Sequence, residues 1–370
     1  MSSSLARPAW QLPAAIAAAL AVGFAITALV SAEPWRAFLA LLTGALPDIR
    51  FTDVEGWQVR RLVRFGSVIE DAITLTFLGL AIAIPFRARQ FSLGADGQMF
   101  LAALAAGAVS LAIGGPGYVV LPAAFAAALL TGFAWGLVPG WLKARYGASE
   151  IVTTLMLNLI AVQVYRLAIT QWMRDPHAGF LVTPVLPDAA ILPNLLARTN
   201  VSAMLYLVPL AVAGAWALLM RTTLGYEIRT VGQAPAFARH AGMPVGRAMV
   251  LSMALGGVFA ALAGVHVSNA LLKRLPVDLM PGMGFEGLVV ALLARNEPRA
   301  IPMAAFLYAY LRAGAQAMER TTDVSRELVL VIEAFIILFV VSERLLPRRP
   351  AAGWLQRAAL TLRLRAKEAP

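Results

Sequence analysis

The chain contains 370 residues, of which 60% are hydrophobic and 14% charged, and its mean hydropathy is +0.74. Soluble domains have about 45–50% apolar and about 25% charged residues, so water is not the main solvent of this chain. Several apolar runs approach the ~20 residues that a helix needs to cross a bilayer, and they do not alternate as barrel strands do. The sequence therefore predicts an all-α polytopic membrane protein.

The formal net charge is +11. In a soluble protein this excess would suggest nucleic-acid binding, but here the basic residues lie between apolar runs and near the C-terminus, where the positive-inside rule explains them. The chain has no cysteine and three histidines. Disulfides, thiolate metal sites and cysteine nucleophiles are therefore excluded, and we expect neither a metal site nor a nucleic-acid partner.

Hydropathy and charged breaks predict about ten transmembrane helices in one domain, 1–370. The first apolar run, Leu12 to Val30, exceeds the ~7–15-residue core of a signal peptide, so we interpret it as a span and not as a cleaved leader. The predicted spans lie near 12–32, 72–86, 93–113, 117–140, 150–171, 203–220, 248–270, 283–295, 299–317 and 327–345.

The predicted inside loops are rich in arginine and lysine, whereas the outside loops mix basic with acidic residues. Both termini are therefore predicted to be cytoplasmic. The outside loops 33–71 and 172–202 are long, and Trp57 to Phe65 has the spacing of an amphipathic surface helix, with a solvated loop as the alternative. The basic tail, 346–370, alternates Leu or Trp with Arg and is predicted to rest on anionic lipid headgroups.

Two short segments share one pattern of glycine, any residue, acid and glycine. They are Gly94-Ala-Asp-Gly97 and Gly284-Phe-Glu-Gly287, each followed by small and apolar residues. The predicted topology puts the first at the cytoplasmic start of span three and the second at the outer start of span eight, which indicates two inverted-topology halves. Chance in a glycine-rich chain is the alternative. Asp96 and Glu286 are expected to cap their helices and to line a pathway.

The loop 221–247 is the longest predicted inside connection before the tail. Pro235 suits a first helical turn and Gly242 the residue after a helix, so a short helix is predicted over Pro235 to Ala241. Such a helix on the cytoplasmic face is suited to contact a partner protein.

Four ordered segments between residues 70 and 345 carry a family resemblance. The segment from Gly225 to Met243 resembles the coupling-helix region of ABC permeases of the branched-chain amino-acid and simple-sugar superfamily, nucleoside branch. Phe91-Ser-Leu-Gly-Ala-Asp-Gly-Gln98 resembles that branch's Phe-Asn-Ile-Gly-x-Glu-Gly-Gln signature, and Ser149 to Asn158 and the segment beginning at Gly284 resemble two more. Ser92, Asp96 and the Arg295-Asn-Glu-Pro turn depart from the family pattern and leave the substrate open.

The resemblance implies a permease domain over residues 1–370 in a bacterial inner membrane, importing nucleosides or related sugars. It implies three partners: a second homologous permease, an ABC ATPase with two nucleotide-binding domains, and an extracytoplasmic binding protein. No lysine of this chain has the setting of a phosphate-binding loop, so no cofactor is expected here and ATP belongs to the ATPase. The residues that would couple to it are Gly232, Pro235, Phe237, Arg239, His240 and Gly242.

Amides that hydrogen-bond a base or ribose, and aromatic rings that stack on it, are the expected lining of the pathway. Helix packing is the alternative for each. The binding protein is expected to dock on Arg174, Lys273 and Arg274, unless these are ordinary loop charges. The candidate lining residues, with the two acids, are Phe91, Asp96, Gln98, Asn158, Asn269, Phe285 and Glu286.

An ion-driven secondary transporter is the rival function. It would need titratable groups deep in the spans, and Glu333 and Arg166 are the embedded charges that the sequence suggests besides the Gly-acid-Gly pair. A membrane enzyme is disfavoured, because His266 is the sole histidine within a predicted span and no nucleophile–base set accompanies it.

Overall fold

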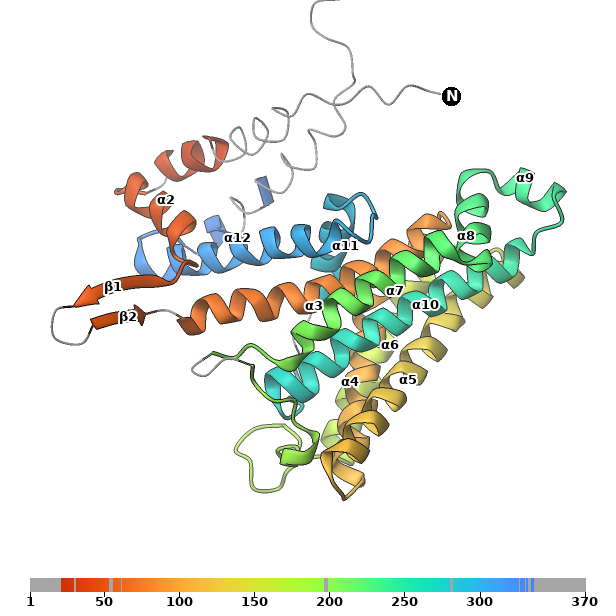
Figure 1. Cartoon of the computed structure of the whole chain (residues 1–370), viewed down its shortest axis with the longest axis horizontal. Helices are drawn as coiled ribbons and strands as arrows, with labels where there is room; N and C mark the ends of the chain where they lie inside the picture. The colour runs from red at the N-terminus through yellow and green to blue at the C-terminus, as the bar shows by residue number, and fades with distance from the viewer. Residues whose placement is uncertain are drawn as a thin grey trace, which may run out of the picture.

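A computed structural model describes residues 21–29, 31–52, 56–60, 62–195, 199–279, 282–325, 327–329, 331 and 334–335. It is a helix bundle with one small β-hairpin (Figure 1). After helical residues 21–29, the elements are α2 Pro34–Thr43, β1 Asp48–Thr52, β2 Gly56–Arg60, α3 Leu62–Arg87, α4 Ala95–Ala112, α5 Gly117–Tyr146, α6 Glu150–Gln171, η1 Asp188–Ala190, η2 Ala203–Tyr206, α7 Leu207–Arg221, α8 Thr223–Gln233, α9 Pro235–His240, α10 Val245–Val265, the π-helix η3 His266–Leu272, α11 Met283–Leu293 and α12 Ile301–Thr321.

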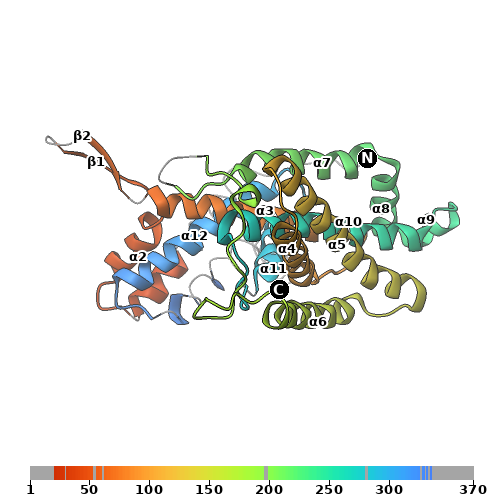
Figure 2. The same ribbon diagram turned by 90° about the horizontal axis from the view of Figure 1, so that it is seen from below.

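Helices α3 and α10 form the centre of the bundle. In the apolar 18-residue stretch of α3, 83% of the residues are buried. The corresponding share is 28% for α6 and 17% for the span formed by η2 and α7. Figure 2 shows α6 and α7 on opposite flanks. Small residues let α10 approach α5 closely: a Cβ on Gly132 or Gly257 would collide with the backbone carbonyl of the other residue. Packing of this kind holds helices together where lipid gives no hydrophobic drive.

The bundle has two distinct ends. Helices α8 and α9 lie at one, which we call the α9 end, and the β-hairpin and the loop 172–195 lie toward the other, the hairpin end (Figure 1). The segment after η3 belongs to the hairpin end, because Thr183 and Leu186 donate backbone hydrogen bonds to the carbonyls of Leu275 and Lys273. Helices α3, α5 and α10 connect the two ends.

Helix α2 packs on α12, far away in the sequence. The Tyr310 hydroxyl donates to the carbonyl of Leu42, and a Cβ on Gly314 would collide with the carbonyl of Leu41. Beside this contact the Asp323 carboxylate accepts hydrogen bonds from the Ser31 hydroxyl (2.6 Å) and the amide of residue 32 (2.8 Å), which lower the pKa of Asp323. Residues 31–42 are thus held in place by residues 310–323.

Within the described residues, six helices are long and apolar enough to span a membrane: α3, α4, α5, α6, η2 with α7, and α10 with η3. The prediction for 150–171 matches α6. The expectation of a full span at 283–295 is wrong, because α11 has 11 residues and reaches about half-way through a bilayer. The number of about ten spans is therefore not confirmed. Residues 12–20 and 30 of the first predicted span, most of the span 327–345, Glu333 and the tail 346–370 lie outside the described residues.

The region before α3 differs from its prediction. The amphipathic helix expected from Trp57 to Phe65 is wrong for residues 57–60, because Gly56–Arg60 is a strand paired antiparallel with β1, in register Ile49 to Val59, and only residues 62–65 are helical, as the start of α3. The Trp-Gln-Val-Arg alternation has the period of a strand, which explains the difference. Helix α3 begins at Leu62, ten residues before the predicted 72, because the charged residues that suggested a loop are hydrogen-bonded inside the bundle.

Candidate functional site

The two Gly-acid-Gly segments meet in the structure. The amide of Gly284, at the start of α11, donates a 2.6 Å hydrogen bond to Asp96 Oδ1, at the start of α4. The predicted placement of the two segments at opposite membrane surfaces is therefore wrong. Residues 88–94 fold back from the end of α3, and residues 273–279 follow the end of η3, so that α4 and α11 both begin inside the bundle.

The meeting point lies between the two ends of the molecule. Gly287 packs on Leu78 in the middle of α3, and the amide of Gly97 donates to Asn158 Oδ1, two turns into α6. From here α4 runs to the hairpin end, where Gly107 packs on Leu275. Helix α11 runs the opposite way and reaches the end of α3, where Arg87 donates to the carbonyl of Asn296.

Asp96 lies between the positive ends of two helix dipoles. It is in the first turn of α4 and accepts from the first turn of α11, and it is buried with 7% of its surface exposed. Partial charges of about half a unit at each N-terminus favour an anion here. A carboxylate in this position joins α4 and α11, because its hydrogen bond is to the start of α11 and not to its own helix, which it was predicted to cap.

Asn158 fixes the loop that leads into α4. Its Nδ2 donates to the Leu93 carbonyl (2.6 Å), and Oδ1 accepts from Gly97, while Thr154 Oγ1 accepts from the Leu93 amide (3.2 Å). Both polar atoms of this amide therefore hold the loop and the first turn of α4 in place. Gln98, in the first turn of α4, is buried with 3% exposed.

Two aromatic side chains close in sequence to Asp96 and Gly284 are exposed on the surface of the protein. Phe285, which follows Gly284, is 50% exposed, and Phe91 is 41% exposed with its ring 4.5 Å from that of Phe86. Exposed ring faces are surfaces on which a flat ligand can stack.

The second acid of the pattern has a different environment. Glu286 forms an ion pair with Arg312 of α12 (2.7 Å), and both side chains are partly buried. Sequence reasoning did not single out Arg312, although a charged residue within the predicted span 299–317 is the signal that marks such positions. Glu286 therefore connects α11 to α12.

Asn269 is separated from this group. It lies in the π-helix η3 near the hairpin end, is fully buried, and its Nδ2 donates to Ser110 Oγ and to the Ala190 carbonyl, both at 2.9 Å. Its Oδ1 accepts from the Ser268 hydroxyl. Because all its hydrogen-bonding groups join protein elements, the structure gives Asn269 a packing role and not the predicted lining role.

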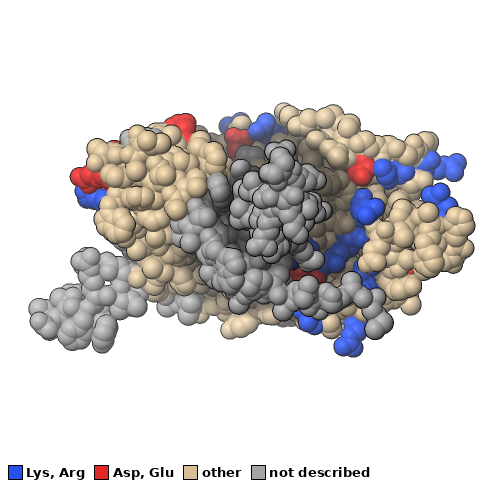
Figure 3. All heavy atoms as spheres, turned by 90° about the horizontal axis from the view of Figure 1, so that it is seen from above, with Lys and Arg blue, Asp and Glu red and all other residues tan. Residues whose placement is uncertain are grey.

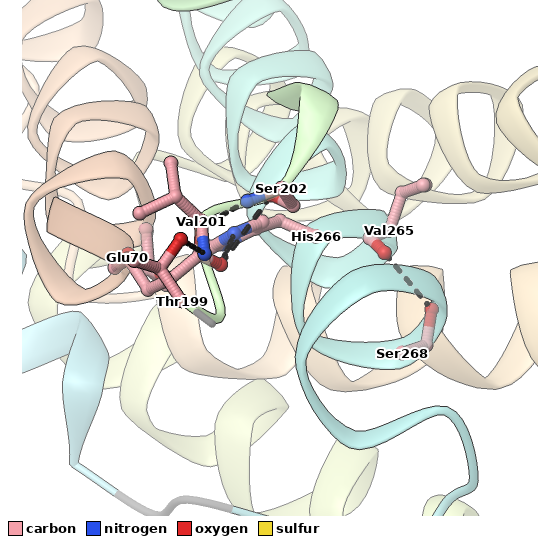
Figure 4. A network of polar contacts seen from close by, with 8 residues as sticks. Glu70, Thr199, Val201, Ser202, Val265, His266 and Ser268 are labelled. Carbon is pink, nitrogen blue, oxygen red and sulfur yellow. Dashed lines mark hydrogen bonds and ion pairs between the residues drawn. The ribbon is translucent and has the colours of Figure 1, made fainter. Parts of the chain in front are cut away.

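A buried polar network that the sequence did not predict joins α3, η3 and η2 (Figure 4). His266 Nε2 lies 2.7 Å from Glu70 Oε2, and its Nδ1 lies 2.8 Å from Thr74 Oγ1. The amide of Ser202 donates to Glu70 Oε1 at 2.6 Å. The imidazole and the carboxylate each have hydrogen-bonding partners inside the bundle, which reduces the cost of burying them. Glu70 was hidden from sequence analysis because it was assigned to an outside loop.

The loop 221–247 forms two helices at the α9 end. The predicted helix is confirmed as α9, Pro235–His240, and the preceding α8 was not predicted. Phe237 is 61% exposed, and Arg239, His240 and Gly242 are exposed as well. Gly232 is buried so close to the Arg87 carbonyl that a Cβ would collide with it. The loop therefore presents an exposed aromatic and basic tip while its base is pressed on the end of α3.

The three residues predicted to dock a binding protein lie together at the hairpin end. Arg174 and Arg274 are exposed, and the Arg274 guanidinium stacks on Phe180 at 4.9 Å. Lys273 is half-buried, and its carbonyl accepts from Leu186. Arg166, expected as an embedded charge, pairs with Asp278 at 2.8 Å, with both side chains exposed.

Comparison with known proteins decides the family. Residues 65–341 match the family described as branched-chain amino acid transport system, permease component. The chain belongs to this family. It is a multi-pass membrane permease and the transport subunit of an ABC importer, as its resemblance implied.

The permease is similar over most of its length to characterised transport proteins. It is 30% identical to the glucose ABC transporter permease protein TsgB13 of Haloferax volcanii, covering 90% of this chain and 87% of that one. It is 32% identical to the guanosine ABC transporter permease protein NupP of Bacillus subtilis (75% and 80% covered) and 28% identical to the nucleoside ABC transporter permease protein NupB of Lactococcus lactis subsp. cremoris (77% and 82%). No solved structure matches the permease.

Proposed function

We propose that this permease imports nucleosides or related simple sugars through a pathway next to the Asp96–Gly284 contact. The contact between the starts of α4 and α11 carries the proposal, because discontinuous helices that meet inside a bundle are where transporters bind their substrates. The substrate class follows the guanosine, nucleoside and glucose permeases to which the chain is similar. Phe91 and Phe285 stack on the substrate, and Gln98 contributes an amide.

The pathway lies between two inverted halves of about ten spans in all. One half contains α3, which runs to the α9 end, followed by α4, which begins inside the bundle and runs back to the hairpin end. The other contains α10, which runs to the hairpin end, followed by α11, which starts inside and returns in the opposite sense to α4. The opposite directions of these helix pairs support the inversion.

The α9 end faces the cytoplasm of a bacterial cell, in its inner membrane, and both termini lie on that side. Figure 3 supports this orientation, because lysine and arginine gather at the end where α8 and α9 lie. Positive loops stay on the cytoplasmic side. The basic residues of this end are Arg87, Arg89, Lys143, Arg145, Arg221, Arg229, Arg239, Arg247, Arg295 and Arg299.

Three partners complete the transporter. A second homologous permease faces this one, an ATPase with two nucleotide-binding domains receives α9, and an extracytoplasmic binding protein docks on Arg174, Lys273 and Arg274 at the hairpin end. ATP-driven closure moves α8 and α9, and Gly232 passes that motion to the end of α3 through its contact with Arg87. The cycle alternates two conformations of different substrate affinity.

Changing the exposed tip of α9 is expected to remove the ATPase. Phe237→Asp and Arg239→Glu put negative charge on an exposed surface, so the permease keeps its fold while the contact with the ATPase is lost. The measurement is recovery of the ATPase with the tagged permease. The matched controls are Tyr146→Asp, an equally exposed aromatic at the end of α5, and Arg145→Glu beside it. Undiminished recovery with both α9 variants would refute the coupling assignment.

Truncating the exposed aromatics is expected to weaken uptake without affecting assembly. Loss of a stacking face removes about 1–3 kcal/mol of base stacking, so Phe285→Ala or Phe91→Ala raises the half-saturating concentration roughly five- to a hundredfold. Uptake of labelled guanosine and glucose by proteoliposomes with the complete transporter and its binding protein provides the measurement. Phe306→Ala on α12, 42% exposed, is the control. Parent-like uptake of both compounds by both variants would exclude these rings from the pathway.

A further inference from the structure

A groove runs along the flank of the bundle between α7 and the start of α12. Its volume is about 530 Å³, within the ~300–1,000 Å³ of small-ligand sites, and its walls are apolar apart from one arginine. Val208, Val212 and Trp216 of α7 and Pro302 of α12 line it, with Arg299 at one end. From Val208 to Trp216 the groove follows α7 for about 12 Å.

Two positive charges lie beside Trp216, Arg299 in the lining of the groove and Arg221 next to it. The Arg299 guanidinium lies 3.9 Å from the Trp216 ring centre, and that of Arg221 lies 5.3 Å from the same ring. Neither arginine forms an ion pair with any described residue. Arg221 ends α7, so both charges lie where this span leaves the hydrocarbon.

We infer that the groove binds one anionic phospholipid. An acyl chain lies along α7 between Val208 and Trp216, and the phosphodiester pairs with Arg299 and Arg221 at the membrane boundary. An apolar channel inside the bilayer, with two cations at its polar edge that pair with no described residue, matches the two halves of a phospholipid. Basic pockets between transmembrane helices are a known mode of lipid binding. Trp216 holds both guanidinium groups in place by cation–π contact.

A second permease is the other candidate occupant of this flank, since the span that contains α7 is only 17% buried. The charges favour lipid. Two arginines buried in a protein interface would need carboxylates from the partner, whereas anionic headgroups supply negative charge along the whole membrane boundary.

The test is native mass spectrometry of the complete transporter released from nanodiscs of phosphatidylglycerol and phosphatidylcholine. The parent is expected to retain phosphatidylglycerol in preference to phosphatidylcholine. Arg299→Gln is expected to lower retention roughly fivefold, and adding Arg221→Gln more than tenfold, while Arg145→Gln at the same end leaves it unchanged. Equal retention by the parent and the double variant would overturn the inference, as would displacement of the lipid by millimolar inorganic phosphate.

The acyl-chain half is tested separately with phosphatidylglycerol brominated in its chains. Bromine is expected to quench the Trp216 fluorescence, measured as the difference between the parent and Trp216→Phe. In a second experiment, Val212→Trp is expected to block entry of the acyl chain and to reduce lipid retention, even though both arginines remain. Absence of quenching, together with cross-linking of Ala213→Cys to the second permease, would assign the groove to that partner.

Discussion

Gly284→Ala is expected to abolish uptake. A Cβ at this position would lie 2.8 Å from both the backbone nitrogen and the Cγ of Asp96, closer than real Cβ contacts come. The starts of α4 and α11 would have to separate. Overpacking destabilises the fold by about 1–3 kcal/mol, and loss of the hydrogen bond to Asp96 by about a further 1.5–3 kcal/mol. We expect a lower unfolding temperature and uptake at background level in proteoliposomes.

Gly214→Ala in α7 is the matched control, because nothing lies within 4 Å of a Cβ there. This variant should transport like the parent and gain slightly in stability through helix propensity. If Gly284→Ala transported at the parental rate, the contact between α4 and α11 would have no part in the transport cycle.

His266→Leu is expected to destabilise the folded permease more than any surface change. It leaves the Glu70 carboxylate, 3% exposed, with the Ser202 donors but without its imidazole partner. Breaking a buried pair in this way costs about 3–5 kcal/mol. The unfolding temperature of the purified complex should fall markedly, whereas Thr74→Val, which removes a single hydrogen bond to the ring, should cost about 1 kcal/mol.

The double variant Glu70→Leu with His266→Leu distinguishes an ion pair from simple packing. Replacing both members removes the uncompensated charge, so the double variant should be more stable than His266→Leu alone. A double variant whose loss equals the sum of the two single losses would show that Glu70 and His266 act independently.

The spans could be predicted from the sequence where hydrophobicity alone decides them. The bounds of α6 matched, and the short α9 followed from Pro235 and Gly242. Signals of this kind are local, since apolar length and helix-end residues act within a few turns.

What could not be predicted depends on contacts between distant residues. The segment around Glu70 was predicted to be a loop, because the partner that allows Glu70 to be buried, His266, lies 196 residues away. Helix α11 was predicted to be a full span, because hydropathy does not report the depth at which a helix begins. At the candidate site, the paired glycine-acid patterns pointed to two segments that are in contact, but the contact at Asp96 could be seen only in the structure. Asn269 was predicted to line the pathway because the sequence does not distinguish an asparagine that bonds other protein groups from one that bonds a ligand.

The packing of α2 on α12 has a consequence for how the chain is made. Tyr310 and Leu42 are 268 residues apart, so a ribosome adding ~5–20 residues per second completes α12 roughly 15–50 s after α2. During that interval α2 lacks its packing partner. Helix α2 can therefore pack only after α12 has been made, and a chain truncated before α12 leaves the buried face of α2, Ala37 and Leu41, uncovered.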